Sequence, residues 1–421
     1  MAEPSRAVHA DPSGRVRSIS QVLLGIVIAA LYLPALAPVG VRTDISAHLV
    51  FAQHLSLTGR SPVAYPLFHQ ATIVVRALIP FELLAKVNPD LDARLTTWDI
   101  AAVATLLGFV ILTAELVYSR FLADASLWSR RRAYPVCLAL TLCALTVTPV
   151  TILTWSRHQL LRGYVGINTF DSPTFIVLTP LALALFWQLT DRLFCRSGTR
   201  ATAFLAVLSL LTLHAKPSYT VCLLPAVCLF IVVARARQKS PDWRLVLLGL
   251  VVPSVLYLAY QELTFDQQGS VVIAPFEEVS FFLEAHDQSI WMFFPLLLLS
   301  ALFPVTVTLA YWGQWRHRTS FILAWVTFAI GVALYSLLSI RGRPDYGDFI
   351  TCAQISLLIL FVESMRFVIA QQSDVGIRNA TSRSTLSFDL RMSLVTVAFT
   401  LHVVCGTLFY YQEVTNPADW W

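Results

Sequence analysis

An acidic residue, Asp44, follows the first long apolar run of the chain and is the residue whose type and position best suit chemistry. It lies in the stretch VRTDISAH (residues 41–48), at the mouth of a membrane span. A carboxylate there can act as a general base on a substrate held at the membrane surface. His48 follows about one helical turn later and could orient the carboxylate. The alternatives are a helix N-terminal cap for Asp44 and a satisfied interfacial histidine for His48.

Basic residues form the second group with chemical potential. Lys216 follows an apolar run (201–214) of about 14 residues, which as a helix of ~1.5 Å per residue is shorter than a ~30 Å hydrocarbon core. Its ammonium is therefore expected at or below headgroup depth, where it could bind a lipid phosphate, unless it only snorkels from the helix end. Arg341 and Arg343 flank a late turn and could either add contacts to the same phosphate or anchor headgroups.

A second carboxylate, Asp171, precedes Ser172-Pro173, which is a favourable helix start, so capping and a functional role are both open. Asp44 and Asp171 together could bind a hard divalent cation, although two carboxylates still need a third ligand. The seven cysteines form no CxxC pair and indicate neither a zinc site nor a disulfide framework.

The composition excludes a soluble globular domain, because 57% of the 421 residues are hydrophobic and only 13% are charged. We predict an all-α polytopic membrane protein with about eleven transmembrane helices. The predicted spans are 20–40, 97–118, 133–154, 172–190, 201–214, 217–234, 245–263, 290–312, 320–340, 349–369 and 391–411.

The segment 62–86 decides the topology, because it is long enough to cross but carries Arg76 near its middle. If it stays on the outer side, the arginine-rich loops fall inside and the acidic loop near 266–287 falls outside, as the positive-inside rule favours. Residues 41–96 then form a long first external loop with two interfacial helices, 48–58 and one from Pro66.

The chain is thus divided into a cytosolic tail (1–18), a transmembrane module (19–240) that includes the external loop, and a second transmembrane module (241–421). The formal net charge of +5 fits basic cytosolic loops that face anionic membrane lipids, and no nucleic-acid partner is predicted.

The order of these elements resembles the GT-C glycosyltransferases, in particular the protein O-mannosyltransferases and the lipid A aminoarabinose transferases. Those enzymes have an acidic residue after the first span, a second interfacial helix that opens with a Lys-Pro-Pro-Leu-like stretch, an Asp-Pro element, a Thr-Lys-Gly-Pro-like turn and a late Arg- and Tyr-rich turn. The similar stretches in this chain are DISAHLVFAQHLSLTG (44–59), YPLFH (65–69), DSP (171–173), LTLHAKP (211–217) and RGRPDY (341–346). The chain departs from the pattern in having no second acidic residue beside Asp44 and no glycine after Lys216.

The resemblance implies an integral, multi-pass enzyme that transfers a sugar with inversion from a polyprenyl-phosphate donor on the outer, periplasmic, extracellular or lumenal side. A single base suffices for such a reaction, because the departing phosphate needs no second acid. The implied catalytic residues are Asp44, Asp171 and His48. The implied donor-phosphate ligands are Lys216, Arg341, Arg343 and Tyr346.

The acceptor would be a lipid, a protein or a glycan such as one of the cell envelope, and the absence of a soluble domain after the last span favours a lipid or a lipid-linked glycan. Two other classes stay open. A transporter or flippase for a lipid-linked intermediate would show two related halves with matched broken helices, and a non-catalytic subunit of a membrane complex would explain the weakened motifs.

Overall fold

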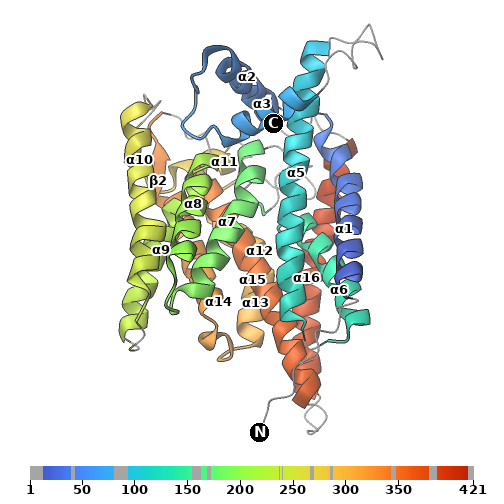
Figure 1. Cartoon of the computed structure of the whole chain (residues 1–421). Coiled ribbons are helices and arrows are strands. Elements are labelled where there is room, and N and C mark those ends of the chain that lie inside the picture. The colour runs from blue at the N-terminus through green and yellow to red at the C-terminus, as the bar shows by residue number, and fades with distance from the viewer. Residues whose placement is uncertain are drawn as a thin grey trace, which may run out of the picture.

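Hydrophobic helices make up almost the whole of the chain in its computed structural model (Figure 1). The structure describes residues 13–38, 43–79, 93–126, 128–153, 163–167, 172–236, 238, 240–265, 270–284, 288–342, 348–378 and 386–415. Eight described helices are long and apolar enough to cross a membrane, and a bent pair brings the number to as many as nine. The chain is therefore an all-α multi-pass membrane protein.

The elements follow one another along the chain with few long connections. The first half contains α1 (Ser13–Leu36), α2 (Thr43–Thr58), α3 (Leu67–Leu78), α5 (Ala93–Asp124), α6 (Arg130–Thr146), α7 (Pro173–Arg192), α8 (Thr199–Ala215) and α9 (Ser218–Ala236). The second half contains the π-helix η3 (Leu245–Val251), α10 (Val252–Thr264), β1 (Val271–Ile273), α11 (Glu277–Glu284), η4 (Ile290–Met292), α12 (Phe293–Ser300), α13 (Leu302–Ala310), η5 (Trp315–His317), α14 (Thr319–Leu337), β2 (Leu338–Ile340), α15 (Asp348–Arg378) and α16 (Leu386–Thr415).

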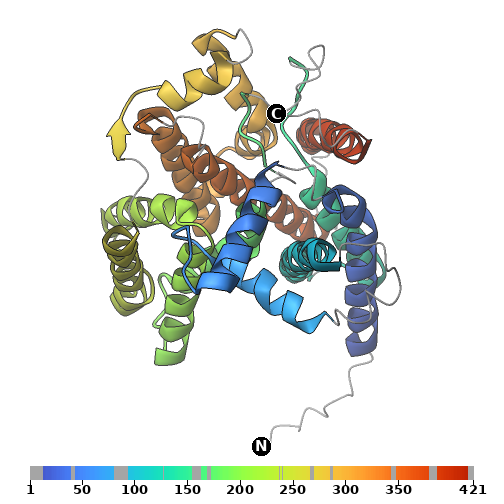
Figure 2. The same cartoon turned by 90° about the horizontal axis from the view of Figure 1, so that it is seen from above.

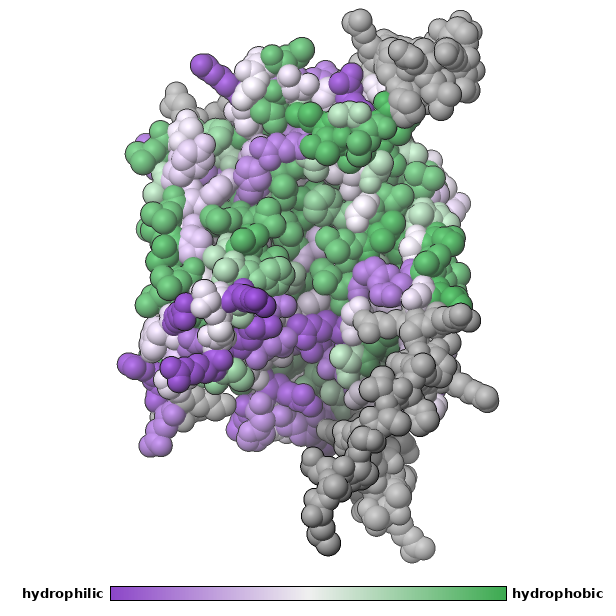
Figure 3. Space-filling model, in the orientation of Figure 1, coloured by the Kyte–Doolittle hydropathy of each residue, from purple (hydrophilic) through white to green (hydrophobic). Residues whose placement is uncertain are grey.

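The bundle has two distinct ends. We call the end that carries α2, α3 and α11 the upper end and the opposite end, where α1 begins, the lower end (Figures 1 and 2). Figure 3 shows hydrophobic residues in a belt across the middle of one face and hydrophilic residues gathered below it. The connections that carry the arginines of segments 192–200, 235–244 and 316–318 lie at the lower end. This separation follows the charge pattern expected of a protein embedded in a bilayer.

The helices α2 and α3 lie across the upper end and do not run through the bundle (Figure 2). The two helices predicted in this segment are thus present at one end of the bundle. Helix α2 packs through Ile45, Leu49 and Ala52, which are buried and follow helical spacing. Its described part begins at Thr43, ahead of the predicted start at His48.

Helix α3 contains only 12 residues, so it spans about 18 Å at ~1.5 Å per residue, which is too short for the ~30 Å core. Its arginine, Arg76, lies over the ring of Trp98 on α5 with 4.4 Å between the guanidinium carbon and the ring centroid. This cation–π contact gives the charge a favourable place at the end of the bundle.

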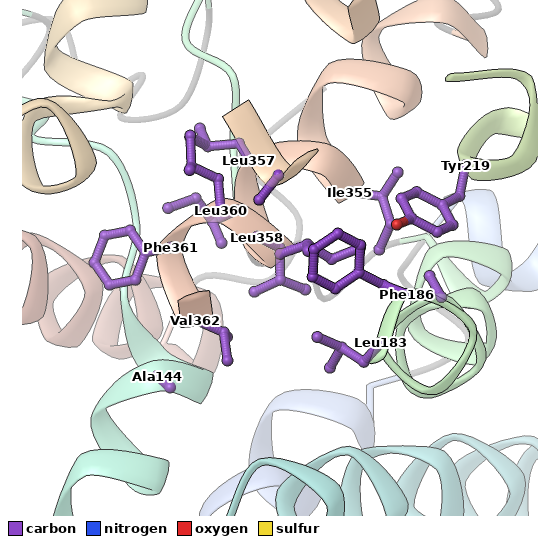
Figure 4. Packing of buried hydrophobic residues seen from close by; sticks show 14 of the residues in the cluster. Ala144, Leu183, Phe186, Tyr219, Ile355, Leu357, Leu358, Leu360, Phe361 and Val362 are labelled. Atoms are coloured by element: carbon purple, nitrogen blue, oxygen red, sulfur yellow. The ribbon is translucent and has the colours of Figure 1, made fainter. Parts of the chain in front are cut away.

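Helix α15 lies in the centre of the hydrophobic core and packs most extensively on α14. Figure 4 shows its residues Ile355 and Leu358 near Leu183 and Phe186 of α7. At Gly331 of α14 an added Cβ would lie 2.7 Å from a backbone oxygen of α15, so only glycine allows the two helices to approach so closely. Because α15 belongs to the second predicted module and α7 to the first, the two modules share one core.

A buried charge network joins three helices near the lower end. Arg366 of α15 donates to Asp124 of α5 through Nε (2.8 Å) and to Glu363 through Nη1 (2.6 Å). Trp187 of α7 also donates to Glu363 from its indole nitrogen (2.7 Å), and the guanidinium groups of Arg366 and Arg120 both lie over the Trp187 ring. Arg366 is thus hydrogen-bonded to both carboxylates, and such pairing lowers the cost of burying charge in a bundle.

The predicted span 290–312 is broken into two helices. The segments Ile290–Ser300 and Leu302–Ala310 meet at 60° around Ala301, so one of the predicted spans is not a straight helix. The first turn of α13 has unsatisfied backbone donors, and one of them, Phe303 N–H, donates to His402 Nε2 of α16 (3.3 Å). The Nδ1 of His402 contacts the carbonyl of Thr148 at 2.5 Å, just after α6 ends. His402 therefore satisfies two helix ends that the hydropathy pattern does not reveal.

Candidate functional site

Asp44 and His48 lie on one face of α2 at the upper end of the bundle. The distance from His48 Nε2 to Asp44 Oδ1 is 3.6 Å, and the Asp44 side chain is 41% exposed whereas that of His48 is 9% exposed. The buried neighbours of α2 fix the helix against the bundle, so the carboxylate lies at the accessible edge and the imidazole lies beneath it. The predicted sharing of one face by these two residues is confirmed.

A second histidine, His69 of α3, completes the group. Its Nε2 lies 2.9 Å from His48 Nδ1, and the two rings are stacked with centroids 5.1 Å apart. Phe51 and Phe68 approach the edges of the pair, and His69 is fully buried. The sequence alone gives His69 no role, because its partner His48 is 21 residues away along the chain.

Both imidazoles are held in the neutral form. Burial, the neighbouring His69 and the charge of Lys216 lower the pKa of His48 from 6.5 to about 3. Burial alone lowers the pKa of His69 from 6.5 to about 4. At neutral pH the pair therefore offers N–H donors and nitrogen lone pairs, and Asp44 is the acidic member of the group.

Acidification should loosen the docking of α2 and α3. The lowered pKa values of His48 and His69 mean that an undocked state binds more protons than the docked state below the ordinary value of 6.5. Stability is thus fully present above that value and falls as pH decreases, by about 2 kcal/mol for each histidine between pH 7.5 and pH 5. Thermal melting at both pH values would measure this loss. The variant His48→Phe/His69→Phe should lose most of the pH dependence, and an unchanged dependence in that variant would contradict the prediction.

Lys216 lies at the upper end of α8, where the helix stops before Pro217. Only 7% of the residue is exposed. Its Nζ donates to Thr351 Oγ1 of α15 (3.2 Å) and lies 5.9 Å from the centroid of the Tyr65 ring. Because Tyr65 lies two residues before α3, the ammonium is next to the α2–α3 group, and its charge adds to the causes that lower the pKa of His48. Lys216 is therefore buried within the protein at the upper end of α8.

The loop that carries Tyr65 is held in place by a hydrogen bond to α10 and by contacts between α3, α8 and α10. Gln261 of α10 donates from Nε2 to the carbonyl of Ala64 (2.6 Å). His214 of α8 contacts Gln70 Oε1 through Nε2 (2.8 Å) and the Tyr257 hydroxyl through Nδ1 (2.5 Å). These contacts connect α3, α8 and α10, and so fix the wall of the site next to Lys216.

The start of α15 is fixed by a carboxylate from α11. Glu278 is buried, and its Oε1 accepts a hydrogen bond from the backbone N–H of Ile350 (3.0 Å). A carboxylate is favoured at a helix N-terminus by the unpaired backbone donors and the helix dipole. This contact holds the turn that carries Thr351, the hydrogen-bond acceptor of Lys216.

The other predicted residues divide into one that is described and three that are not. Arg341 is exposed on the turn after β2, and its backbone N–H donates to Ser270 O (3.0 Å), next to the antiparallel pair β1–β2. Asp171, Arg343 and Tyr346 lie outside the described residues, and with them the predicted carboxylate pair for a divalent cation. Within the described residues no group of three His, Cys, Asp or Glu side chains could hold a metal ion.

Sequence reasoning missed the neutral polar members of this site. They are Gln70, Tyr257, Gln261 and Thr351. Neutral polar residues at the ends of apolar helices are common, and these four come from three separate helices. The available signal was their position in the predicted external loop, for Gln70, or toward the outer end of a predicted span, for the other three.

One cavity of the described structure lies at the lower end of the bundle, away from the α2–α3 group. It is lined by Phe194, Phe230, Val233, Ala234, Trp315, Arg316, His317, Thr319 and Ile322. Its walls come from the lower ends of α9 and α14, so it is separated from Asp44 and Lys216 by the length of the bundle (Figure 1). At the upper end a carboxylate, two neutral imidazoles and a buried ammonium lie on neighbouring elements. No protein-family model matches the chain, and no curated protein matches its sequence significantly.

Proposed function

We propose that this protein is an inverting glycosyltransferase that moves a sugar from a polyprenyl-phosphate donor to a hydroxyl of a lipid, glycan or protein acceptor. The proposed site is the upper end of the bundle, on the outer side of the membrane. The observation that carries the proposal is the buried Lys216 in the same site as Asp44, His48 and His69. The resemblance of the sequence to the GT-C glycosyltransferases supports the same reaction.

Lys216 is suited to the phosphate of a lipid donor by its depth as well as its charge. Helix α8 contains 17 residues, or about 25 Å at ~1.5 Å per residue, so an untilted α8 that starts at the lower interface ends below the upper one. A lysine is costly to bury in an apolar bundle, and such a residue is more often functional than structural. An ammonium at this depth can hold the leaving phosphate while the sugar is transferred.

Asp44 is suited to the acceptor. Its carboxylate is the accessible end of the α2–α3 group, so it can take the proton of an acceptor hydroxyl as that oxygen attacks the anomeric carbon. The carbon–oxygen bond to the phosphate breaks, and the polyprenyl phosphate leaves as an anion that needs no second carboxylic acid. One base and one phosphate-binding cation thus account for the chemistry.

The proposed membrane arrangement has eleven spans. They are the eight long helices, the bent pair α12–α13, and the shorter apolar helices α6 and α8. With the basic connections of the lower end in the cytosol, the upper end faces outward. In this proposed arrangement α2 and α3 belong to a first external loop.

Two cysteine variants test the arrangement. Ser61→Cys and Leu78→Cys lie before and after most of α3, so a membrane-impermeant maleimide should label both from the outer side. The native Cys195, which is exposed on the turn after α7, should be labelled only from the cytosolic side. Labelling of Ser61→Cys and Leu78→Cys from opposite sides would reject both the topology and the assembled site.

Lys216→Ala should weaken the binding of polyprenyl monophosphate by about tenfold or more, since a charge-assisted hydrogen bond contributes about 1.5–3 kcal/mol. Binding is measured by titration of the purified protein with polyprenyl monophosphate alone. Lys216→Arg should retain part of the affinity, and Arg235→Ala at the lower end is the matched control that should retain all of it. Unchanged affinity in Lys216→Ala would return this lysine to a snorkelling role.

The proposed reaction itself is tested by incubating the purified protein with polyprenyl-phosphate sugars and measuring polyprenyl phosphate release.

The break between α12 and α13 favours a second candidate, transport of a lipid-linked intermediate, because discontinuous helices are typical of transporters. Movement of the donor between leaflets of a proteoliposome without release of polyprenyl phosphate would select transport over transfer.

A further inference from the structure

Three side chains of the upper end form a continuous line that leads from the accessible edge into the bundle. Asp44 Oδ1 lies 3.6 Å from His48 Nε2, and His48 Nδ1 lies 2.9 Å from His69 Nε2. The first distance brings an ionised carboxylate close to one ring nitrogen, and the second is a hydrogen bond between two imidazoles. The charge of Asp44 can therefore determine where the protons of both rings lie.

Two neutral tautomer arrangements are compatible with the bond between the rings, and Asp44 distinguishes them. If His48 Nδ1–H donates to His69, the bare lone pair of His48 Nε2 faces the carboxylate, which repels it. If His69 Nε2–H donates to His48 Nδ1, then His48 Nε2 carries its proton toward the carboxylate, which attracts it. The second arrangement is the favoured one, with both rings protonated at Nε2.

The favoured arrangement leaves His69 Nδ1 as a bare lone pair. That atom is buried and has no hydrogen-bond partner among the residues that the structure describes. A buried polar atom without a partner is costly, and a phenylalanine would fill a similar space without that cost. Packing therefore does not explain why both residues are histidines. What the histidine pair does fix is the direction of the His48 N–H.

We propose that His48 and His69 are positioning residues, with His69 setting the tautomer of His48 and His48 Nε2–H orienting the carboxylate of Asp44. The catalytic part of this inference rests on the proposed function, because His48 and His69 are assigned to orient Asp44, the proposed base. Asp44 alone exchanges a proton with the acceptor, and the two imidazoles keep their protons. The tautomers themselves are a property of the resting protein and do not depend on any substrate.

The first test is ¹⁵N NMR of the full-length protein labelled at histidine, in lipid nanodiscs at neutral pH. Signals are assigned by their loss in His48→Phe and His69→Phe. We expect both rings to be neutral and protonated at Nε2, and Asp44→Ala to produce a mixture of tautomers. A His48 ring protonated at Nδ1 in the parent, or tautomers that are unchanged in Asp44→Ala, would overturn the proposal.

The second test separates orientation from packing. His48→Phe/His69→Phe should keep the melting temperature at neutral pH near that of the parent, because an apolar pair of similar shape replaces both partners. Its kcat should fall by about 10- to 100-fold, as expected when a catalytic group remains but is no longer oriented, with unchanged affinity for polyprenyl monophosphate. A normal kcat in this variant would overturn the positioning role.

Two further variants serve as controls in the same assay. His69→Gln can still donate an N–H to His48 Nδ1 and should retain more kcat than His69→Phe. His54→Phe changes an exposed histidine of the same helix and should alter neither kcat nor the NMR signals of the pair. Absence of polyprenyl phosphate release in the parent rejects the proposed function alone, because the NMR test decides independently whether Asp44 and His69 set the tautomer of His48.

Discussion

Asp44→Asn should lower the rate of glycosyl transfer by at least about 100-fold, the usual effect of removing a general base. Asparagine keeps the shape of the side chain but cannot accept the proton of the acceptor hydroxyl. The carboxylate lies in the first described turn of α2 and is 41% exposed, so its loss should change stability only slightly. Initial rates of polyprenyl phosphate release and melting curves of the purified variant measure the two effects.

Glu277→Gln provides the matched control for this result. Glu277 is an exposed carboxylate in the first turn of α11, which also lies at the upper end, and the proposed reaction gives it no role. Its rate should equal that of the parent. If Asp44→Asn also turned over at the parental rate, Asp44 would not be the base and a non-catalytic subunit would become the preferred interpretation.

The largest expected loss of stability belongs to the charge network near the lower end. Arg366→Met should destabilise the protein by about 3–5 kcal/mol, because it leaves buried carboxylates without their cation. The side chains of Glu363 and Asp124 are only 3% and 19% exposed, so water cannot replace the arginine effectively. Denaturant titration or thermal melting in one detergent measures the change.

Two variants identify the cause of that loss. Arg366→Met combined with Asp124→Asn and Glu363→Gln should recover much of the stability, because no uncompensated charge remains. Arg120→Met removes a more exposed ion pair with Asp191 and should cost about 1 kcal/mol or less. Equal losses in Arg366→Met and Arg120→Met would show that burial does not govern the network.

Local patterns predict the parts of this fold that depend on neighbouring residues. The apolar runs predict the long helices, and the spacing of Leu49 and Ala52 predicts the buried face of α2. Arg76 predicts that its segment does not cross, because a charge in an apolar segment is costly wherever the rest of the fold lies, and α3, which carries Arg76, lies across the upper end. The pairing of Asp44 with His48 is also local, since one helical turn separates them.

These local patterns do not predict contacts between residues that are distant along the chain. The bond between His48 and His69 joins residues 21 positions apart, and the bond between Lys216 and Thr351 joins residues 135 apart. The contact of His402 with the start of α13 is hidden for the same reason, because it comes from another helix. Hydropathy averages over each segment and carries no information on which partner will satisfy a backbone group.

The position of His402 has a consequence for how the protein is made. Its ring joins the end of α6 to the start of α13, yet α16 emerges from the ribosome after both of those segments. Until α16 inserts, the carbonyl of Thr148 and the N–H of Phe303 lack this partner in a medium that supplies little water. The earlier helices can therefore enter the bilayer in order, but their final packing must wait for α16. Completion of the core thus depends on the synthesis and insertion of α16.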